Sequence, residues 1–98
     1  MANRGLNKNE RRQRFDALLK ADELCRQGRA YELPDISKAN PIKARLSCKY
    51  TRDFFGYTKG TDILITSARQ TGERITLTIK IEGDDRNLGG SLWDVMGY

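Results

Sequence analysis

Residues 62–82, DILITSARQTGERITLTIKIE, decide the fold. Two runs with apolar residues at alternate positions, 62–68 and 74–82, flank the polar stretch RQTGE. Alternation with a period of two is typical of a half-buried strand, and a glycine between two such runs is typical of a hairpin turn. The sequence therefore predicts an antiparallel hairpin over these residues.

The length of the connecting loop sets the register of this hairpin. A three-residue loop, Gln70 to Gly72, sets Arg69 opposite Glu73, with Gly72 at positive φ. A two-residue loop would slip the pairing by one residue and mix polar with apolar side chains. We therefore predict the three-residue loop. It puts on one face Ile63, Ile65, Ser67, Ile75, Leu77 and Ile79.

Residues 42–50, IKARLSCKY, continue the alternation upstream. Ile42, Leu46 and Tyr50 share one side of this predicted strand, and cations occupy the other side. Since the apolar side faces the core, the opposite side should be exposed and basic. On it we expect Lys43, Arg45 and Lys49, with Lys80 beside Thr76 and Thr78 on a neighbouring strand.

Asn7 to Gly28 has the pattern of an amphipathic helix. Asn7 is a suitable N-cap residue, and Gly28 can adopt the left-handed conformation that ends helices. Apolar residues recur at helical spacing. The face predicted to be buried comprises Phe15, Leu18, Leu19, Ala21 and Cys25.

These elements predict an α+β fold in which the N-terminal helix packs on one face of a three- to four-stranded antiparallel meander. We expect residues 1–6 to be a flexible basic arm and 7–82 a single domain. Residues 83–98 should then be a glycine-rich tether and an aromatic tail, with a helical turn capped by Ser91. A short edge strand is expected at Ala30 to Leu33.

The charge distribution favours an anionic partner. The 98-residue chain has a net charge of +5, but residues 1–52 carry 13 Lys or Arg against 6 Asp or Glu. This imbalance is typical of nucleic-acid binding without sequence specificity, to DNA or RNA, since no helix-turn-helix or zinc signature accompanies it. Aromatic residues stack on the bases of single-stranded targets, and the loop next to the basic strand offers Phe54, Phe55 and Tyr57. The predicted contacts are Lys43, Arg45, Lys49, Lys80, Arg11, Arg12, Arg14 and Tyr57.

A second hypothesis is a protein-binding accessory factor. Such an inhibitor, adaptor or assembly component of a viral or ribonucleoprotein particle would offer its basic surface to an acidic partner. Aromatic residues dominate interface hot spots. The docking residues would be Trp93, Met96 and Tyr98. An exposed strand edge at 42–50 or 30–33 would also suit a homodimer.

The composition argues against several other classes of protein. Without histidine the chain lacks the commonest general base and a usual zinc ligand, so we expect neither an enzyme nor a metal or other cofactor. Cys25 and Cys48 are interpreted as buried thiols rather than a disulfide. Charged residues near the start do not suit a signal peptide, and no apolar run is long enough to span a membrane. A cytoplasmic location is expected.

Overall fold

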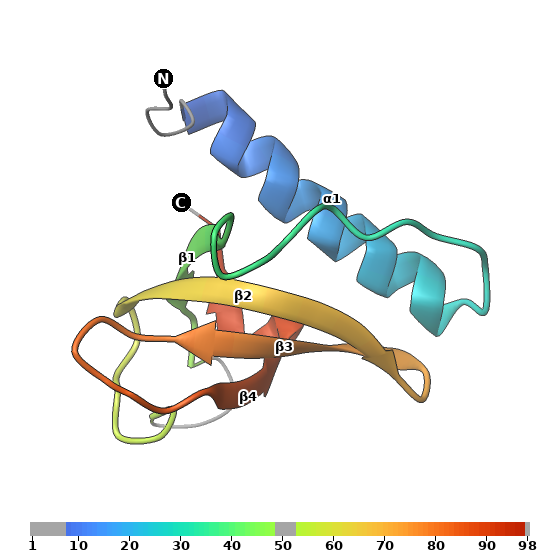
Figure 1. Cartoon of the computed structure of the whole chain (residues 1–98). Coiled ribbons are helices and arrows are strands. Elements are labelled where there is room, and N and C mark those ends of the chain that lie inside the picture. Colours follow the sequence, from blue (N-terminus) through green and yellow to red (C-terminus); the bar gives the residue numbers. More distant parts are fainter. Residues whose placement is uncertain (1–7, 49–52, 98) are drawn as a thin grey trace.

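The structure, a computed structural model, describes residues 8–48 and 53–97. Within these residues one α-helix is followed by five strands, which is an α+β arrangement, as predicted (Figure 1). The elements in chain order are α1 (Lys8–Arg26), β1 (Ile42–Leu46), β2 (Asp62–Thr71), β3 (Arg74–Lys80), β4 (Leu88–Ser91), the 3-10 helix η1 (Leu92–Asp94) and β5 (Val95–Met96).

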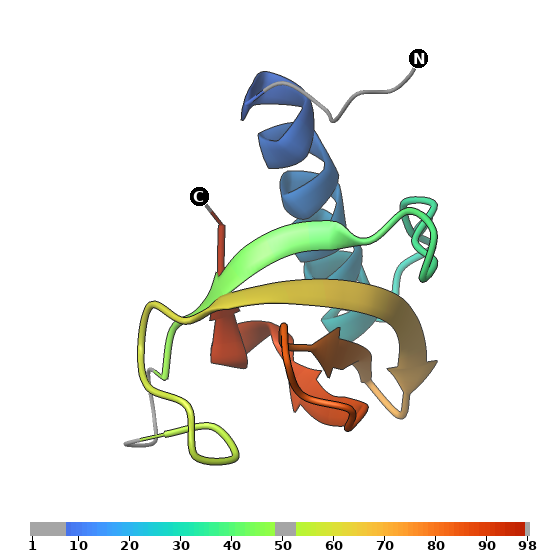
Figure 2. The ribbon, with the colours of Figure 1, turned by 60° about the vertical axis from the view of Figure 1, so that its left-hand side comes forward.

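The sheet is antiparallel, and its strands follow the order β4-β3-β2-β1-β5. The first four strands form the predicted meander, and the fifth is additional. Only the three residues of η1 separate β4 at one edge from β5 at the other. The sheet therefore curls to bring its two edges together, and α1 lies along one side of it (Figures 1 and 2).

The predicted hairpin exists, but the predicted loop length is wrong. Only Gly72 and Glu73 connect the strands, and Thr71 pairs with Arg74. Gly72 has a φ of 65°, and Glu73 has no positive φ. This is the pattern of a type II′ turn, which matches the twist of antiparallel strands and favours glycine at its first central position.

A β-bulge at Thr66 compensates for the shorter turn. Toward the base of the hairpin Ile65 pairs with Ile79, and toward the tip Arg69 pairs with Thr76 rather than lying opposite Glu73. A bulge places one extra residue in one strand and so reverses the side to which later residues point. Both Ile65 and Thr66 are consequently buried. The bulge keeps the isoleucines in the core and turns Arg69 outward.

Helix α1 buries the predicted apolar face, with one exception. Phe15, Leu18, Ala21 and Cys25 are buried, whereas Leu19 is 41% exposed, so its predicted burial is wrong. The helix ends as predicted near Gly28, whose φ is 72°. The amides of residues 28 and 29 donate to the carbonyls of residues 25 and 24, which is a Schellman motif.

Residues 83–98 are predicted from the sequence to be a tether and tail. Their described part, up to residue 97, contributes β4 and β5 to the sheet and η1 between them. Ser91 precedes η1, and its amide and hydroxyl donate to one carboxylate oxygen of Asp94 at 2.9 and 3.1 Å. The hydroxyl of Ser47 donates to the carbonyl of Trp93 at 2.6 Å, which fixes η1 against the end of β1. Leu92 and Val95 are buried in the common core.

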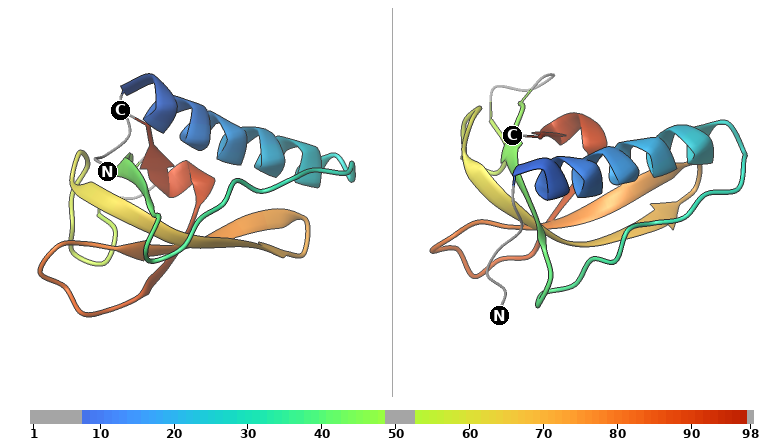
Figure 3. Two further views of the ribbon diagram at one scale, coloured as in Figure 1. Left: turned by 45° about the horizontal axis from the view of Figure 1, so that its top comes forward. Right: turned by 90° about the horizontal axis from the view of Figure 1, so that it is seen from above.

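Two predictions about strand edges are wrong. Residues 30–33 form no strand, and residues 47–48 lie beyond the end of β1. Strand β1 is internal, because β2 pairs with one edge and β5 with the other. A homodimer through either predicted edge therefore has no structural basis. The linker that contains residues 30–33 instead runs beside α1 and returns to β1 (Figure 3).

Candidate functional site

The outer face of the sheet, the side away from the buried core, carries the predicted basic residues. Lys43 and Arg45 alternate with buried residues of β1 and are exposed. Pairing places Leu64 between Lys43 and Lys80, and it places Arg69 beside Thr76. Three adjacent strands thus bring four cations to one side of the sheet. We call these the outer-face cations: Lys43, Arg45, Arg69 and Lys80.

The outer-face cations differ in how far the protein itself neutralises them. Arg45 pairs with Asp62 of the neighbouring strand, with 3.6 Å between Nε and Oδ1. Both side chains are largely exposed, at 46% and 75%, so solvent screens this pair strongly. Lys43 forms no ion pair with the residues that the structure describes. Lys80 is half-buried and donates from Nζ to the backbone carbonyl of Asp84 at 3.1 Å.

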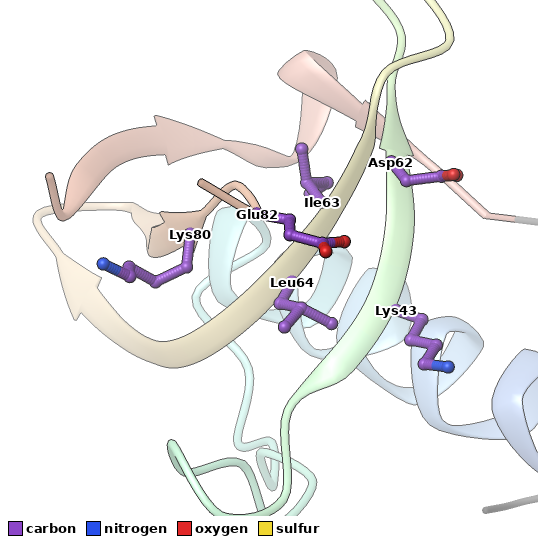
Figure 4. Close-up of a pocket in the computed structure, with 6 residues that line it drawn as sticks. All are labelled: Lys43, Asp62, Ile63, Leu64, Lys80 and Glu82. Carbon is purple, nitrogen blue, oxygen red and sulfur yellow. The ribbon is translucent and has the colours of Figure 1, made fainter. Parts of the chain in front are cut away.

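A hollow of about 300 Å³ opens on this face between β1 and β3. Leu64 forms its floor, and the ammonium groups of Lys43 and Lys80 point in opposite directions from it (Figure 4). The carboxylates of Asp62 and Glu82 lie at its rim. Two lysines and two carboxylates therefore surround the apolar floor of the hollow.

The helix contributes less to a basic surface than the sequence indicates. Arg12 is exposed. Arg14, in contrast, donates to the carbonyls of residues 35, 40 and 41 at 2.7–2.9 Å and so holds the linker against α1. The side chain of Arg11 lies outside the described part of the chain, as do Lys49 and Tyr98.

Tyr57 belongs to a hydrogen-bonded cluster at the end of the sheet away from α1. Its hydroxyl donates to Asp84 at 2.7 Å, and the guanidinium of Arg86 donates to both oxygens of the same carboxylate at 2.8–3.2 Å. These bonds from Arg86 and Tyr57 hold the pKa of Asp84 well below its ordinary value. The bond to Asp84, together with desolvation, raises the pKa of Tyr57. Tyr57 is half-buried, and its hydroxyl has a partner within the protein.

Two of the predicted docking residues, Trp93 and Met96, are described, and they have different neighbours. Trp93 is 41% exposed and, with Leu19, lines a second hollow of about 320 Å³ between α1 and η1. The guanidinium of Arg74 lies 4.1 Å from the centroid of the Trp93 ring. Met96 pairs with Arg45 and is half-buried at the edge of the outer face.

Sequence analysis missed two basic residues of this region. Arg69 reaches the outer face only because of the bulge at Thr66, and no local sequence pattern predicts that bulge. Arg86 was overlooked because its glycine-rich surroundings suggested a tether. Its Nη2 donates to the carbonyl of Phe55, a residue 31 positions earlier in the chain.

Other features of the described residues add no chemistry to the site. Both cysteines are free thiols; Cys25 is buried as predicted, whereas Cys48 is only half-buried, so its predicted burial is wrong. No group of three or more metal-ligating side chains occurs in residues 8–48 and 53–97. Within the same ranges, no helix combines the length and the apolar character that crossing a membrane requires.

Comparisons with protein-family models, with curated proteins and with solved structures give no match to this chain.

Proposed function

We propose that the protein binds nucleic acid through its phosphate backbone, without sequence specificity, on the outer face of the sheet. The observation that carries this proposal is the gathering of Lys43, Arg45, Arg69 and Lys80 on one exposed side of three adjacent strands. Two carboxylates share this face: Asp62 pairs with Arg45, and Glu82 lies at the rim of the hollow between Lys43 and Lys80. Cations on a sheet can follow a phosphate backbone and release its counterions.

Two further features support contact with a polyanion. The net charge of +5 raises the rate of association with an anionic chain. Arg12, which is exposed on α1, adds to the positive charge that an anionic chain would meet. Arg14 would take no part, because its donors already bind the linker carbonyls.

The test is retention on a heparin column and on immobilised duplex DNA. The double variant Lys43→Glu, Arg69→Glu reverses two exposed cations of the outer face. The matched control Lys20→Glu, Lys38→Glu makes the same change in net charge at exposed positions elsewhere. We expect the first variant to elute at much lower salt than the control. Equal elution of the two variants would show that net charge alone governs retention and would contradict the proposed surface.

A second candidate function is docking of a protein partner in the hollow between α1 and η1. Two of the large hydrophobic side chains that are exposed in the described residues, Leu19 and Trp93, line it beside Arg26 and Arg74. Tryptophan and arginine are enriched in interface hot spots. A protein that copurifies from the native cell after nuclease treatment, and is lost from the Trp93→Ala variant, would favour this function. Copurification that survives the substitution would exclude the hollow as the docking site.

A further inference from the structure

Phe55 belongs to a tight turn in the segment 53–61, which lies away from α1 (Figure 2). Phe54 and Tyr57 exchange backbone hydrogen bonds at 2.8 and 2.9 Å, so Phe55 and Gly56 are the two central residues. Both have positive φ, 52° and 92°, which defines a type I′ turn. Such a turn favours asparagine at its first central position, and a bulky aromatic residue there is strained.

The strained side chain is not needed to fill the core. Phe55 is 52% exposed, whereas its neighbour Phe54 is buried. The two rings meet edge to face, with centroids 4.8 Å apart and planes at 85°. A buried ring thus supports an exposed one. Because strain persists where the surrounding structure imposes it, and often at functional sites, Phe55 is a candidate for binding.

The cluster around Asp84 positions Arg86 beside this ring. The Arg86 guanidinium lies 5.9 Å from the Phe55 centroid and its Nη2 donates to the Phe55 carbonyl at 3.5 Å. Asp84 in turn holds Arg86 through the guanidinium and the backbone amide, and it holds Tyr57 through the hydroxyl. The ring and a guanidinium are therefore fixed next to each other before any ligand arrives.

The turn is connected to the outer face through Lys80. The ammonium group of Lys80 donates to the carbonyl of Asp84, the residue that binds Arg86. On its other side Lys80 borders the hollow that Lys43 also lines (Figure 4). A chain of contacts through Arg86, Asp84 and Lys80 thus links the Phe55 ring to the hollow on the outer face, and Asp84 offsets the charge of Arg86 in an ion pair at 2.8 Å.

We propose that Phe55 stacks on an unpaired base, so that the preferred ligand is single-stranded nucleic acid. This inference rests on the proposed function, because the phosphates on either side of the stacked base would lie near Arg86 and Lys80. An exposed aromatic face accepts any base, in keeping with the absence of sequence specificity. A duplex offers phosphates but keeps its bases stacked inside, so the ring gives it no advantage.

The experiment measures the affinity of the full chain for two fluorescein-labelled probes by anisotropy. One is a single-stranded oligothymidylate, and the other is a duplex with the same number of phosphates. In the Phe55→Leu variant, which keeps an apolar residue at the same position, we expect affinity for the single strand to fall about 5- to 150-fold. Affinity for the duplex should stay unchanged. The Phe55→Trp variant should retain binding of the single strand.

A second variant separates binding from folding. Phe55→Asn installs the residue that a type I′ turn favours, so the midpoint of thermal unfolding should rise by a few degrees while single-strand affinity falls. Loss of affinity in a variant more stable than the wild type cannot come from misfolding.

The outcomes distinguish this inference from the proposed function. The stacking role would be overturned if single-strand affinity were unchanged in Phe55→Leu and Phe55→Asn. The proposed phosphate-binding face would still hold if the double variant Lys43→Glu, Arg69→Glu lost binding. An equal loss for both probes in Phe55→Leu would also overturn stacking. Failure of the wild type to bind either probe in dilute buffer would overturn both proposals.

Discussion

Asp22 of α1 accepts a hydrogen bond from the backbone amide of Ile75 of β3, with 3.1 Å between the two atoms. The carboxylate is buried, and it also pairs with Arg26 one turn later in the helix at 3.3 Å. Since Ile75 follows the turn of the main hairpin by two residues, this bond ties the helix to the hairpin at its tip. The bond adds a directional contact to the apolar packing that holds α1 against the sheet.

We expect Asp22→Ala to destabilise the protein by roughly 1–3 kcal/mol, because it leaves the buried amide of Ile75 without an acceptor. The measurement is the free energy of unfolding in urea. Asp16→Ala, at an exposed position of the same helix, is the control and should stay within about 0.5 kcal/mol of the wild type. Equal effects of the two substitutions would show that the bond to Ile75 contributes nothing.

Two adjacent glycines of β4 should respond in opposite ways to alanine. A Cβ at Gly90 would lie 2.9 Å from Ile79 and 3.2 Å from the ring of Phe54, whereas one at Gly89 would meet nothing within 4 Å. Gly90→Ala should therefore cost about 1–3 kcal/mol through overpacking. Gly89→Ala should be neutral or should stabilise by up to about 1 kcal/mol, because it restricts the unfolded chain. Thermal or urea unfolding measures both, and similar values would contradict the packing of Phe54 against β4.

The lowered pKa of Asp84 gives the protein a defined sensitivity to acid. A carboxyl group whose pKa is lower in the folded state stabilises the fold above its unfolded pKa of about 3.9, and that stabilisation is lost as the pH falls below this value. In Asp84→Asn, stability should decline less steeply than in the wild type below about pH 4. Asp85→Asn removes the same charge from the adjacent exposed position and serves as the control. If the Asp84→Asn variant lost stability as steeply as the wild type below about pH 4, the lowered pKa of Asp84 would not be the cause of the acid sensitivity.

Local patterns in the sequence predict the strands and the helix but not the way the sheet closes. Alternation identifies β1, β2 and β3, and Gly28 marks the end of α1. Strand β4 contains two glycines and β5 has only two residues, so neither carries a periodic signal. Both form because the curled sheet offers them unpaired edges and because Gly90 leaves room for Phe54.

The candidate site was predictable to a similar degree. Lys43 and Arg45 follow from the alternation of β1 alone, and the structure places them on the exposed side. Arg69 was assigned to the wrong register, because a bulge costs little locally and is selected by the fit of the whole sheet. The position of Arg86 next to Phe55 depends on two turns that meet only after folding.

The most direct test of the central claim is the salt dependence of binding to a single-stranded oligonucleotide. If the outer-face cations contact phosphates, the logarithm of the affinity of the wild type falls linearly with the logarithm of the salt concentration. The magnitude of this slope should decrease by roughly 0.7 for each cation that is removed. The single variant Lys43→Gln removes one cation, and the double variant Lys43→Gln, Arg69→Gln removes two. A wild-type affinity independent of salt, or slopes that the two substitutions leave unchanged, would contradict the account.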